Sequence, residues 1–242
     1  MSIDVVAVVG AGTMGGGIAQ MFAENGLSTY LWDKNAELTK HSIETIGKRL
    51  EKSVEKGAMT AEAARLCMSK LQPCEELSQL AKADLIVEAI FEDLEAKQAL
   101  FAQLENILEP RTLIASNTSS LSISELAASF KHPERFLGLH FFNPPTKLAL
   151  LEVVSTESFD AARLPEIKQL LLKCGKQPVE VKDSPGFIVN RLLLPLINEA
   201  ARLLDAEVAE VSDIDAAMRL GALHPAGPLQ VADLIGLDIC CD

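Results

Sequence analysis

The stretch Val5-Val6-Ala7-Val8-Val9-Gly10-Ala11-Gly12-Thr13-Met14-Gly15 decides the expected fold of this chain. An apolar strand runs directly into the pattern G-x-G-x-x-G. A helix is then expected over residues 14–25, and a second strand over residues 28–32 leads to Asp33. The glycine pattern alone is a weak signal. This order of strand, turn, helix, strand and acid is typical of a dinucleotide-binding unit.

Each part of this unit has a physical role in holding a dinucleotide. Gly10 permits a tight turn, Gly12 lets the backbone approach a pyrophosphate, and Gly15 lets the helix pack closely on the sheet. The helix N-terminus offers N–H groups to the phosphates. Asp33 would accept hydrogen bonds from the adenosine ribose and repel a 2′-phosphate, which favours NAD over NADP. The expected cofactor contacts are Gly10, Ala11, Gly12, Thr13, Met14, Gly15 and Asp33. The alternative is a glycine turn needed for packing only.

The alternation of strands and helices continues along the chain and predicts the α/β class. Further strands are expected at residues 84–89, 112–116, 136–140, 150–154 and 179–182, and a long helical region at 36–70 has a break near Gly57. Continuous apolar strands between helices imply a Rossmann-type, doubly wound, mostly parallel sheet. Because the later strands lack full-length helices between them, we expect one or two antiparallel neighbours at that edge.

The character of the sequence changes at Asp183-Ser184-Pro185-Gly186, after which no strand is expected. We therefore predict an NAD-binding domain over 1–183, with the helical insertion at 36–70, and a smaller all-α domain over 184–242. Three helices are expected there: 187–204 with a kink at Pro195, 213–220 capped by Ser212, and one from Leu229 to the final Cys240-Cys241-Asp242.

Composition narrows the classes of function. The 242 residues are 48% apolar and 23% charged, as in folded globular proteins. A formal net charge of −12 argues against a nucleic-acid partner. No apolar run is long enough to span a bilayer, and the first residues leave no room for a signal or transit peptide, so no membrane partner is expected. Five cysteines without metal-ligand spacing favour reduced thiols in a cytoplasmic protein, and no metal site.

One basic cluster stands out on this acidic chain. Lys48, Lys52 and Lys56 are spaced i, i+4 and i+8 and share one helix face, with Arg49 beside them. The cluster is either a solvated helix face or a landing site for a phosphorylated ligand.

A histidine and a glutamate stand out in two later strands. His140 ends the apolar run Phe136-Leu137-Gly138-Leu139 and opens Phe141-Phe142-Asn143-Pro144-Pro145, and Glu152 interrupts Leu150-Leu151-Glu152-Val153-Val154. A buried carboxylate is costly unless it is paired, and an imidazole on a neighbouring strand is a suitable partner. Such a pair beside a dinucleotide site suits removal of a proton from an alcohol while hydride leaves its carbon. The alternative for His140 alone is a core histidine bonded to a backbone carbonyl.

Two further polar positions remain open to two readings. Asn117-Thr118-Ser119-Ser120 follows a strand, at the edge where open α/β sheets bind ligands, and could contact nicotinamide or substrate. It could equally be an ordinary turn before a helix capped by Ser122. Asn190 lies among apolar residues, so its amide must bond something: a loop, or a substrate.

Taken together, these segments resemble the short-chain L-3-hydroxyacyl-CoA dehydrogenase family, in particular its bacterial 3-hydroxybutyryl-CoA dehydrogenases. The resemblance covers essentially the whole chain. It is carried by GAGTMGGGIAQ, LIVEAIFEDLEAKQALF, ASNTSSLSI, GLHFFNP, LLEVV, DSPGFIVNRLL and the GP…D..GLD pattern from Gly227 to Asp238. It implies reversible NAD-dependent oxidation of an (S)-3-hydroxyacyl-CoA to the 3-ketoacyl-CoA, and a homodimer formed through the C-terminal helical domain.

The resemblance also implies roles for individual residues. His140 resembles the general base and Glu152 its carboxylate partner, while Ser119 and Asn190 resemble the groups that hold the reacting oxygen and the thioester. Cofactor contacts are implied for Glu92, Lys97, Asn117, Ser119 and Asn143. Contacts with the CoA portion of the substrate are implied for Ser119, Arg49, Lys52 and Lys56.

The chain departs from the family pattern in ways that affect the interpretation. Where the family often has Ala-Pro-Val-Met, this chain has Pro145-Thr146-Lys147-Leu148, in a loop that borders the acyl group. The family also continues past GLD, so we expect the second domain to be incomplete and the chain truncated. Two other functions stay open: a dehydrogenase of a free 3-hydroxy acid, and a non-catalytic NAD-binding protein.

Overall fold

The computed structural model describes residues 3–237 and 240, and divides the chain into two compact units, Met1–Pro185 and Gly186–Asp242. The boundary falls just beyond the one expected from the sequence. The expected start at Met1-Ser2 and most of the expected helical ending at Cys240-Cys241-Asp242 lie outside the described residues.

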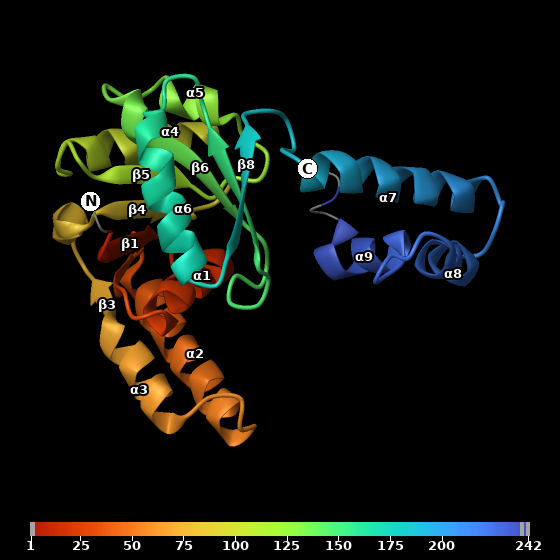
Figure 1. Ribbon diagram of the computed structural model, residues 1–242, viewed down its shortest axis with the longest axis horizontal. Helices are drawn as coiled ribbons and strands as arrows, with labels where there is room; N and C mark the ends of the chain where they lie inside the picture. The colour runs from red at the N-terminus through yellow and green to blue at the C-terminus, as the bar shows by residue number, and fades with distance from the viewer. Residues whose placement is uncertain (1–2, 238–239, 241–242) are drawn as a thin grey trace. The chain divides into compact units, whose positions relative to one another are not determined.

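The first unit is built on one eight-stranded sheet with the order β3-β2-β1-β4-β5-β6-β7-β8 (Figure 1). Every neighbouring pair is parallel except β6 and β7, which are antiparallel. The predicted α/β class with a mostly parallel sheet is therefore confirmed. The strands are β1 (Val5–Val9), β2 (Ser28–Trp32), β3 (Leu71–Cys74), β4 (Leu85–Glu88), β5 (Leu113–Ser116), β6 (Phe136–Phe141), β7 (Leu150–Ser155) and β8 (Gln177–Lys182).

Helices connect most of the parallel strands, as a parallel sheet requires. Side chains begin several of them: Asn35, Asp93 and Ser122 each accept a hydrogen bond from a backbone N–H of the first turn. Two helices, α2 and α3, connect β2 to β3 where other strands are connected by one helix. They extend away from the sheet (Figure 1). The helices of this unit are α1 (Thr13–Glu24), α2 (Ala36–Glu55), α3 (Ala61–Lys70), α4 (Leu94–Glu105), α5 (Ile123–Ala127) and α6 (Leu164–Lys173).

The central strands form the core because they are apolar along their whole length. The side chains of β1 from Val6 to Val9 and of β4 from Leu85 to Val87 have no exposed surface, which requires cover on both faces of the sheet. The two edges differ from the centre. Pro73 lies in the edge strand β3 and Pro178 in the edge strand β8, where a missing N–H costs no hydrogen bond within the sheet.

Two expectations about this sheet need correction. The strand β3 was not expected, since it has only four residues and contains Pro73. The later strands were expected to lack full-length helices, but α6 lies between β7 and β8 and makes that pair parallel. Only one antiparallel pair therefore results, and it is the pair that carries His140 and Glu152.

The second unit is helical, with α7 (Val189–Asp205), α8 (Val211–Gly221) and α9 (Pro228–Ile235). Pro195 lies inside α7, as expected. Ser212 does not cap α8: the N–H groups of Asp213 and Ile214 both donate to Glu210 O at 3.0 Å, so the helix begins earlier and Ser212 lies within it. The helix α9 is instead capped by a side chain from α8, because the Asp215 carboxylate accepts hydrogen bonds from the N–H groups of Leu229 and Gln230 at 2.9 and 3.0 Å.

Candidate active site

The glycine turn lies at the carboxyl end of β1, where the strand order reverses between β1 and β4. Gly10 has φ +103°, and a Cβ there would lie 2.5 Å from Ala89 O. A Cβ on Gly15 would lie 1.8 Å from Gly10 O. Packing therefore requires glycine at both positions. At Gly12, by contrast, a Cβ would meet nothing within 4 Å, so packing does not explain that glycine. Its small size fits the close approach of a ligand instead.

The first turn of α1 is suited to an anion. Gly12 occupies the N-cap position, no side chain caps the helix, and no acidic residue lies in its first turn. Asp33 at the end of β2 fixes the turn from the side: its Oδ2 accepts a hydrogen bond from Ala11 N at 2.9 Å, and its Oδ1 accepts one from Asn35 N at 2.9 Å. Each carboxylate oxygen has two acceptor sites, so Asp33 retains capacity for ribose hydroxyls. These residues fit a dinucleotide.

The pair of His140 and Glu152 follows from the strand register. The two residues lie directly opposite each other in the antiparallel ladder of β6 and β7, which places their side chains on the same face. Nδ1 of His140 lies 2.7 Å from Oε2 of Glu152, and both side chains are buried, with exposed fractions of 7% and 1%. The predicted contact is confirmed. Because an ionised carboxylate only accepts hydrogen bonds, Nδ1 of His140 is the donor in this contact.

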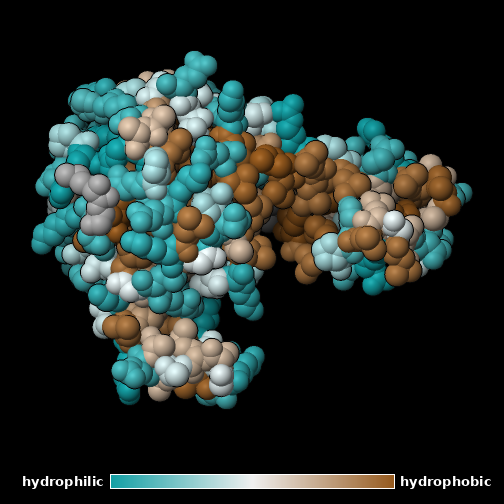
Figure 2. All heavy atoms as spheres, in the orientation of Figure 1, coloured by the Kyte–Doolittle hydropathy of each residue, from teal (hydrophilic) through white to brown (hydrophobic). Residues whose placement is uncertain are grey.

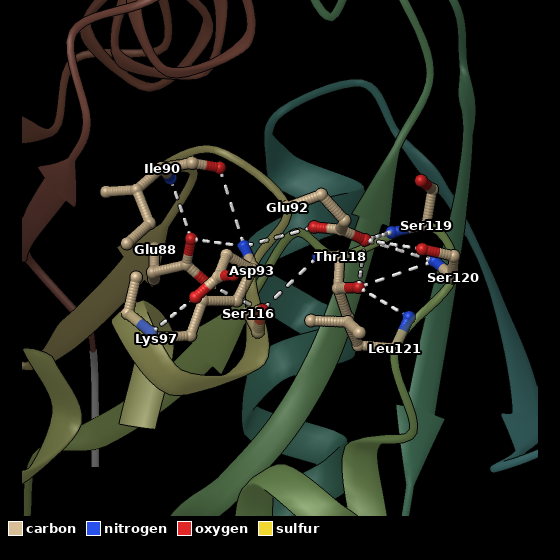
Figure 3. A network of polar contacts seen from close by, with 11 residues as sticks. Glu88, Ile90, Glu92, Asp93, Lys97, Ser116, Thr118, Ser119, Ser120 and Leu121 are labelled. Atoms are coloured by element: carbon tan, nitrogen blue, oxygen red, sulfur yellow. Dashed lines mark hydrogen bonds and ion pairs between the residues drawn. The ribbon is translucent and has the colours of Figure 1, made fainter. Parts of the chain in front are cut away.

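Glu92 fixes the backbone on both sides of Ser119. Its Oε1 accepts hydrogen bonds from Ser119 N at 3.0 Å and from Ser120 N and Oγ at 3.2 and 3.0 Å, and also from the Thr118 hydroxyl (Figure 3). Burial alone would raise the pKa of Glu92. The charge of Lys97 and the hydrogen bonds from Thr118, Ser119 and Ser120 outweigh burial and lower this pKa below its ordinary value. Glu92 is therefore ionised at neutral pH.

Lys97, implied as a cofactor contact, lies between two carboxylates. Its side chain is only 1% exposed, and its Nζ lies 2.6 Å from Glu88 Oε1 and 3.2 Å from Glu92 Oε2. Glu88 was not predicted as a site residue. Its side chain is fully buried at the end of β4, where it also accepts hydrogen bonds from Ile90 N at 2.7 Å and Ser116 Oγ at 2.5 Å. Its burial beside a partner could have been predicted from the sequence, since Glu88 interrupts an apolar run just as Glu152 does.

The two asparagines implied as cofactor contacts lie in different surroundings. The Asn117 side chain is already engaged, because its Oδ1 accepts a hydrogen bond from Phe141 N at 2.9 Å and so ties the end of β5 to β6. Asn143 is exposed in the loop after β6.

Ser122 caps α5, as expected for a turn at Asn117-Thr118-Ser119-Ser120 before a helix, and its hydroxyl donates to Asp183 Oδ2 at 2.8 Å. The segment from Asn117 to Ser120 connects β5 to the capped start of α5, and Ser119 is exposed there.

Three of the basic residues line one pocket. Arg49, Lys52 and Lys56 face the first turns of α1 and the loop at 143–147 across a pocket of about 390 Å³, and Lys147 joins them from that loop. Lys48 is not among its lining residues. The remaining lining residues are Thr13, Gly17, Gln20, Ser53, Asn143, Pro144, Pro145 and Thr146. On a chain of net charge −12, this cationic pocket is suited to a phosphorylated ligand.

Lys176 holds the loop that carries Asn143 and Lys147, and it was not predicted as a site residue. Lys176 is buried, and its Nζ donates to Leu148 O at 2.7 Å and also to Pro145 O. Burial lowers the pKa of Lys176.

Asn190 belongs to the second unit, in the first turn of α7. Within residues 3–237 and 240 there is no cluster of three or more His, Cys, Asp or Glu side chains that could hold a metal ion, and no helix long and apolar enough to cross a membrane.

Comparison with known proteins identifies related sequences over the whole chain. Residues 5–184 match the family profile described as 3-hydroxyacyl-CoA dehydrogenase, NAD binding domain, and residues 186–242 match 3-hydroxyacyl-CoA dehydrogenase, C-terminal domain. The chain is 46% identical to a 3-hydroxyadipyl-CoA dehydrogenase of Escherichia coli over 239 residues, which is 99% of the chain but 50% of that protein. It is 44% identical to a 3-hydroxybutyryl-CoA dehydrogenase of Bradyrhizobium diazoefficiens, covering 98% of the chain and 81% of that protein.

Solved structures give the same result. A crystal structure of 3-hydroxybutyryl-CoA dehydrogenase from Escherichia coli superposes with a TM-score of 0.96 at 46% identity, over 99% of this chain and 51% of that one. An (S)-3-hydroxybutyryl-CoA dehydrogenase from Ralstonia eutropha superposes with a TM-score of 0.96 at 38% identity, over 99% of this chain and 85% of that one. The chain thus spans about half the length of the Escherichia coli relatives and most of the length of the others.

Proposed function

The chain belongs to the 3-hydroxyacyl-CoA dehydrogenase family, and from this membership we propose that it catalyses the reversible NAD-dependent oxidation of an (S)-3-hydroxyacyl-CoA to the 3-ketoacyl-CoA. The proposed substrate class is short-chain, with 3-hydroxybutyryl-CoA as its type, in line with the names of several relatives. The observation that carries the proposal is the buried contact of 2.7 Å between His140 and Glu152, in the same sheet as the glycine turn.

The proposed proton transfer follows from the tautomer of His140. With Nδ1 donating to Glu152, Nε2 is the nitrogen that takes the proton of the 3-hydroxyl group, and the carboxylate stabilises the imidazolium that forms. In the reverse direction the protonated ring polarises the ketone and returns the proton. Bound NAD supplies the hydride acceptor, held at the glycine turn and at Asp33. General acid–base help of this kind contributes about 10²–10⁴-fold.

The remaining site residues have positioning roles in this proposal. The Ser119 hydroxyl and the Asn190 amide hold the reacting oxygen and the thioester, and Asn143 contacts the nicotinamide. Arg49, Lys52 and Lys56 hold the phosphates of CoA, a role supported by the pocket that they line together. Because phosphate groups carry most of the charge of an acyl-CoA, this pocket favours a thioester of CoA over a free 3-hydroxy acid.

We also propose that the chain forms a homodimer through its second unit. The support is the apolar surface of α7–α9: Leu192, Leu220 and Leu234 are 69%, 79% and 77% exposed. Figure 2 shows hydrophobic residues gathered on the visible face of these helices. Large apolar side chains exposed to this degree favour an interaction site on these helices. Sedimentation of the protein at several concentrations tests this proposal, and a monomer at all of them would contradict it.

A cytoplasmic location is a further proposal, supported by the cysteines. Cys67, Cys74 and Cys174 are free and buried, and burial raises their pKa values to about 12, 11 and 11. They are therefore inert thiols with no sign of pairing, which is typical of reducing compartments. Cys241 lies outside the described residues.

The experiment that tests the proposed activity follows NADH oxidation with acetoacetyl-CoA, free acetoacetate, longer 3-ketoacyl-CoA thioesters and a dicarboxylyl thioester. We expect turnover with acetoacetyl-CoA and little with free acetoacetate. His140→Ala should lower kcat about 10²–10⁴-fold with little change in NADH affinity. The matched control is His132→Ala, since His132 forms an exposed pair with Glu134 at 3.1 Å. Turnover of the free acid alone, or an unchanged kcat in His140→Ala, would contradict the proposal.

A further inference from the structure

The turn that presents Ser119 is held by one carboxylate, that of Glu92, rather than by the regular hydrogen bonds of a sheet or helix. Glu92 Oε1 accepts hydrogen bonds from the N–H groups of Ser119 and Ser120 and from the hydroxyls of Thr118 and Ser120. Within the described residues, the Ser119 hydroxyl itself makes no hydrogen bond, and it is exposed. The backbone on either side of this hydroxyl is therefore fixed while the hydroxyl remains available to a ligand.

Glu92 is in turn oriented from behind. Its second oxygen lies 3.2 Å from the Lys97 ammonium, which sits 2.6 Å from Glu88 and is almost fully buried. Glu88 cannot shift easily, because Ile90 N and Ser116 Oγ also donate to it. Figure 3 shows the resulting chain of contacts from the end of β4 through the first turn of α4 to the serine turn.

We propose that Glu92 is a positioning residue for the Ser119 hydroxyl, and that the buried pair of Lys97 and Glu88 sets the orientation of Glu92. This inference rests on the proposed function, in which Ser119 holds the reacting oxygen. It assigns Glu92 a role through the serine turn rather than through contact with the cofactor. A displacement of a substrate-holding group by about 1 Å is enough to cost up to 10²-fold in rate.

Glu92→Gln is the variant that separates these roles. A carboxylate offers acceptor oxygens both to Lys97 and to the turn, whereas a glutamine must place its NH₂ group against one of the two sets of donors. The shape of the side chain is kept, but one of its two partners is lost. Thr118→Val is a second, independent variant: it removes the hydroxyl that donates to Glu92 and that accepts from Leu121 N at 2.9 Å, and it leaves Glu92 in place.

The test is a double-mutant cycle in the whole chain, with Ser119→Ala as the second change and acetoacetyl-CoA reduction as the assay. We expect Glu92→Gln to lower kcat about tenfold in the unmodified background and less than about twofold beside Ser119→Ala, because coupled residues are not additive. Thr118→Val should behave in the same way. The affinity for NADH, followed by its fluorescence, should change by less than about twofold in either variant.

The outcomes distinguish this inference from the proposed function. Equal losses in both backgrounds, or a loss confined to NADH affinity, would overturn the positioning role of Glu92 while leaving the activity in place. If the unmodified protein does not reduce acetoacetyl-CoA, the proposed function fails first, and the inference fails with it. The matched control is Glu37→Gln, because Glu37 forms an exposed pair with Lys40 at 3.1 Å and should leave every measured constant unchanged.

Discussion

Replacing Lys97 with methionine tests the energetic role of the buried ion pair beneath the serine turn. The change removes an ammonium that is 1% exposed and leaves Glu88, whose side chain is fully buried, without its cation. Breaking a buried pair by removal of one partner costs about 3–5 kcal/mol. Glu88 keeps two donors, Ile90 N at 2.7 Å and Ser116 Oγ at 2.5 Å, so we expect a loss of about 3 kcal/mol, the lower end of that range.

This loss can be converted into a melting temperature. For a protein of this size, 1 kcal/mol corresponds to about 2–4 °C, so the Tm of the first unit should fall by about 6–12 °C in Lys97→Met. The double variant Lys97→Met/Glu88→Gln removes both charges together. Because replacement of a whole buried pair is often neutral, the double variant should lie within about 1 kcal/mol of the unmodified protein.

Fluorescence of Trp32 is a suitable probe for this measurement. It is the single tryptophan of the chain and lies in β2, so its signal reports the unfolding of the first unit. Two results would refute the reasoning. One is a Tm of Lys97→Met that differs from the unmodified value by less than 2 °C, which is below the shift expected for 1 kcal/mol. The other is a double variant no more stable than the single one.

Three further predictions concern other parts of the first unit. Gly12→Ala should keep the Tm, because a Cβ there would meet nothing within 4 Å. It should weaken NADH binding at least about tenfold, because the added methyl group prevents the backbone from approaching the pyrophosphate. An unchanged Kd for NADH would contradict this prediction. Lys52→Glu should raise the KM for acetoacetyl-CoA about tenfold at low salt without changing NADH binding. Lys48→Glu is its control, because Lys48 does not line the pocket. The pKa values of Glu92 and Asp183 lie below their ordinary values of 4.5 and 3.8, because hydrogen bonds outweigh burial, helped at Glu92 by the Lys97 charge. Both groups therefore stabilise the fold above these values. That stability is lost as the pH falls through the lowered native pKa values, below about 4.5 for Glu92 and below about 3.8 for Asp183. Tm should therefore drop in acid, and below about pH 3.8 it should drop less steeply in Asp183→Asn.

The sequence predicted the parts of the fold that depend on local patterns. The glycine turn, the acid Asp33 and the apolar strands were recognisable because each has a fixed spacing. The contact of His140 with Glu152 was predictable because a carboxylate in an apolar strand needs a partner on a neighbouring strand. The same argument applied to Glu88 would have predicted a buried cation, and Lys97 lies one helical turn into α4.

Other features depend on contacts between distant segments and could not be read from local patterns. The strand β3 has four residues and contains Pro73, so it exists only because β2 offers it a pairing edge. Lys176 resembles a surface lysine in sequence, and its burial follows from the path of the loop that it fastens. Asp183 was recognised only as a boundary, yet it accepts hydrogen bonds from the N–H groups of Ile123 and Ser124, at the start of α5.

The prolines at the two sheet edges restrict how copies of this protein can associate. Pro73 in β3 and Pro178 in β8 each deprive an outer strand of one backbone donor, and β8 also carries Glu180 and Lys182. A row of unpaired backbone groups would otherwise act as a template for strand addition and fibril growth. Both edges are thus poor templates for a further strand, so we expect concentrated protein to resist cross-β aggregation as long as the first unit stays folded.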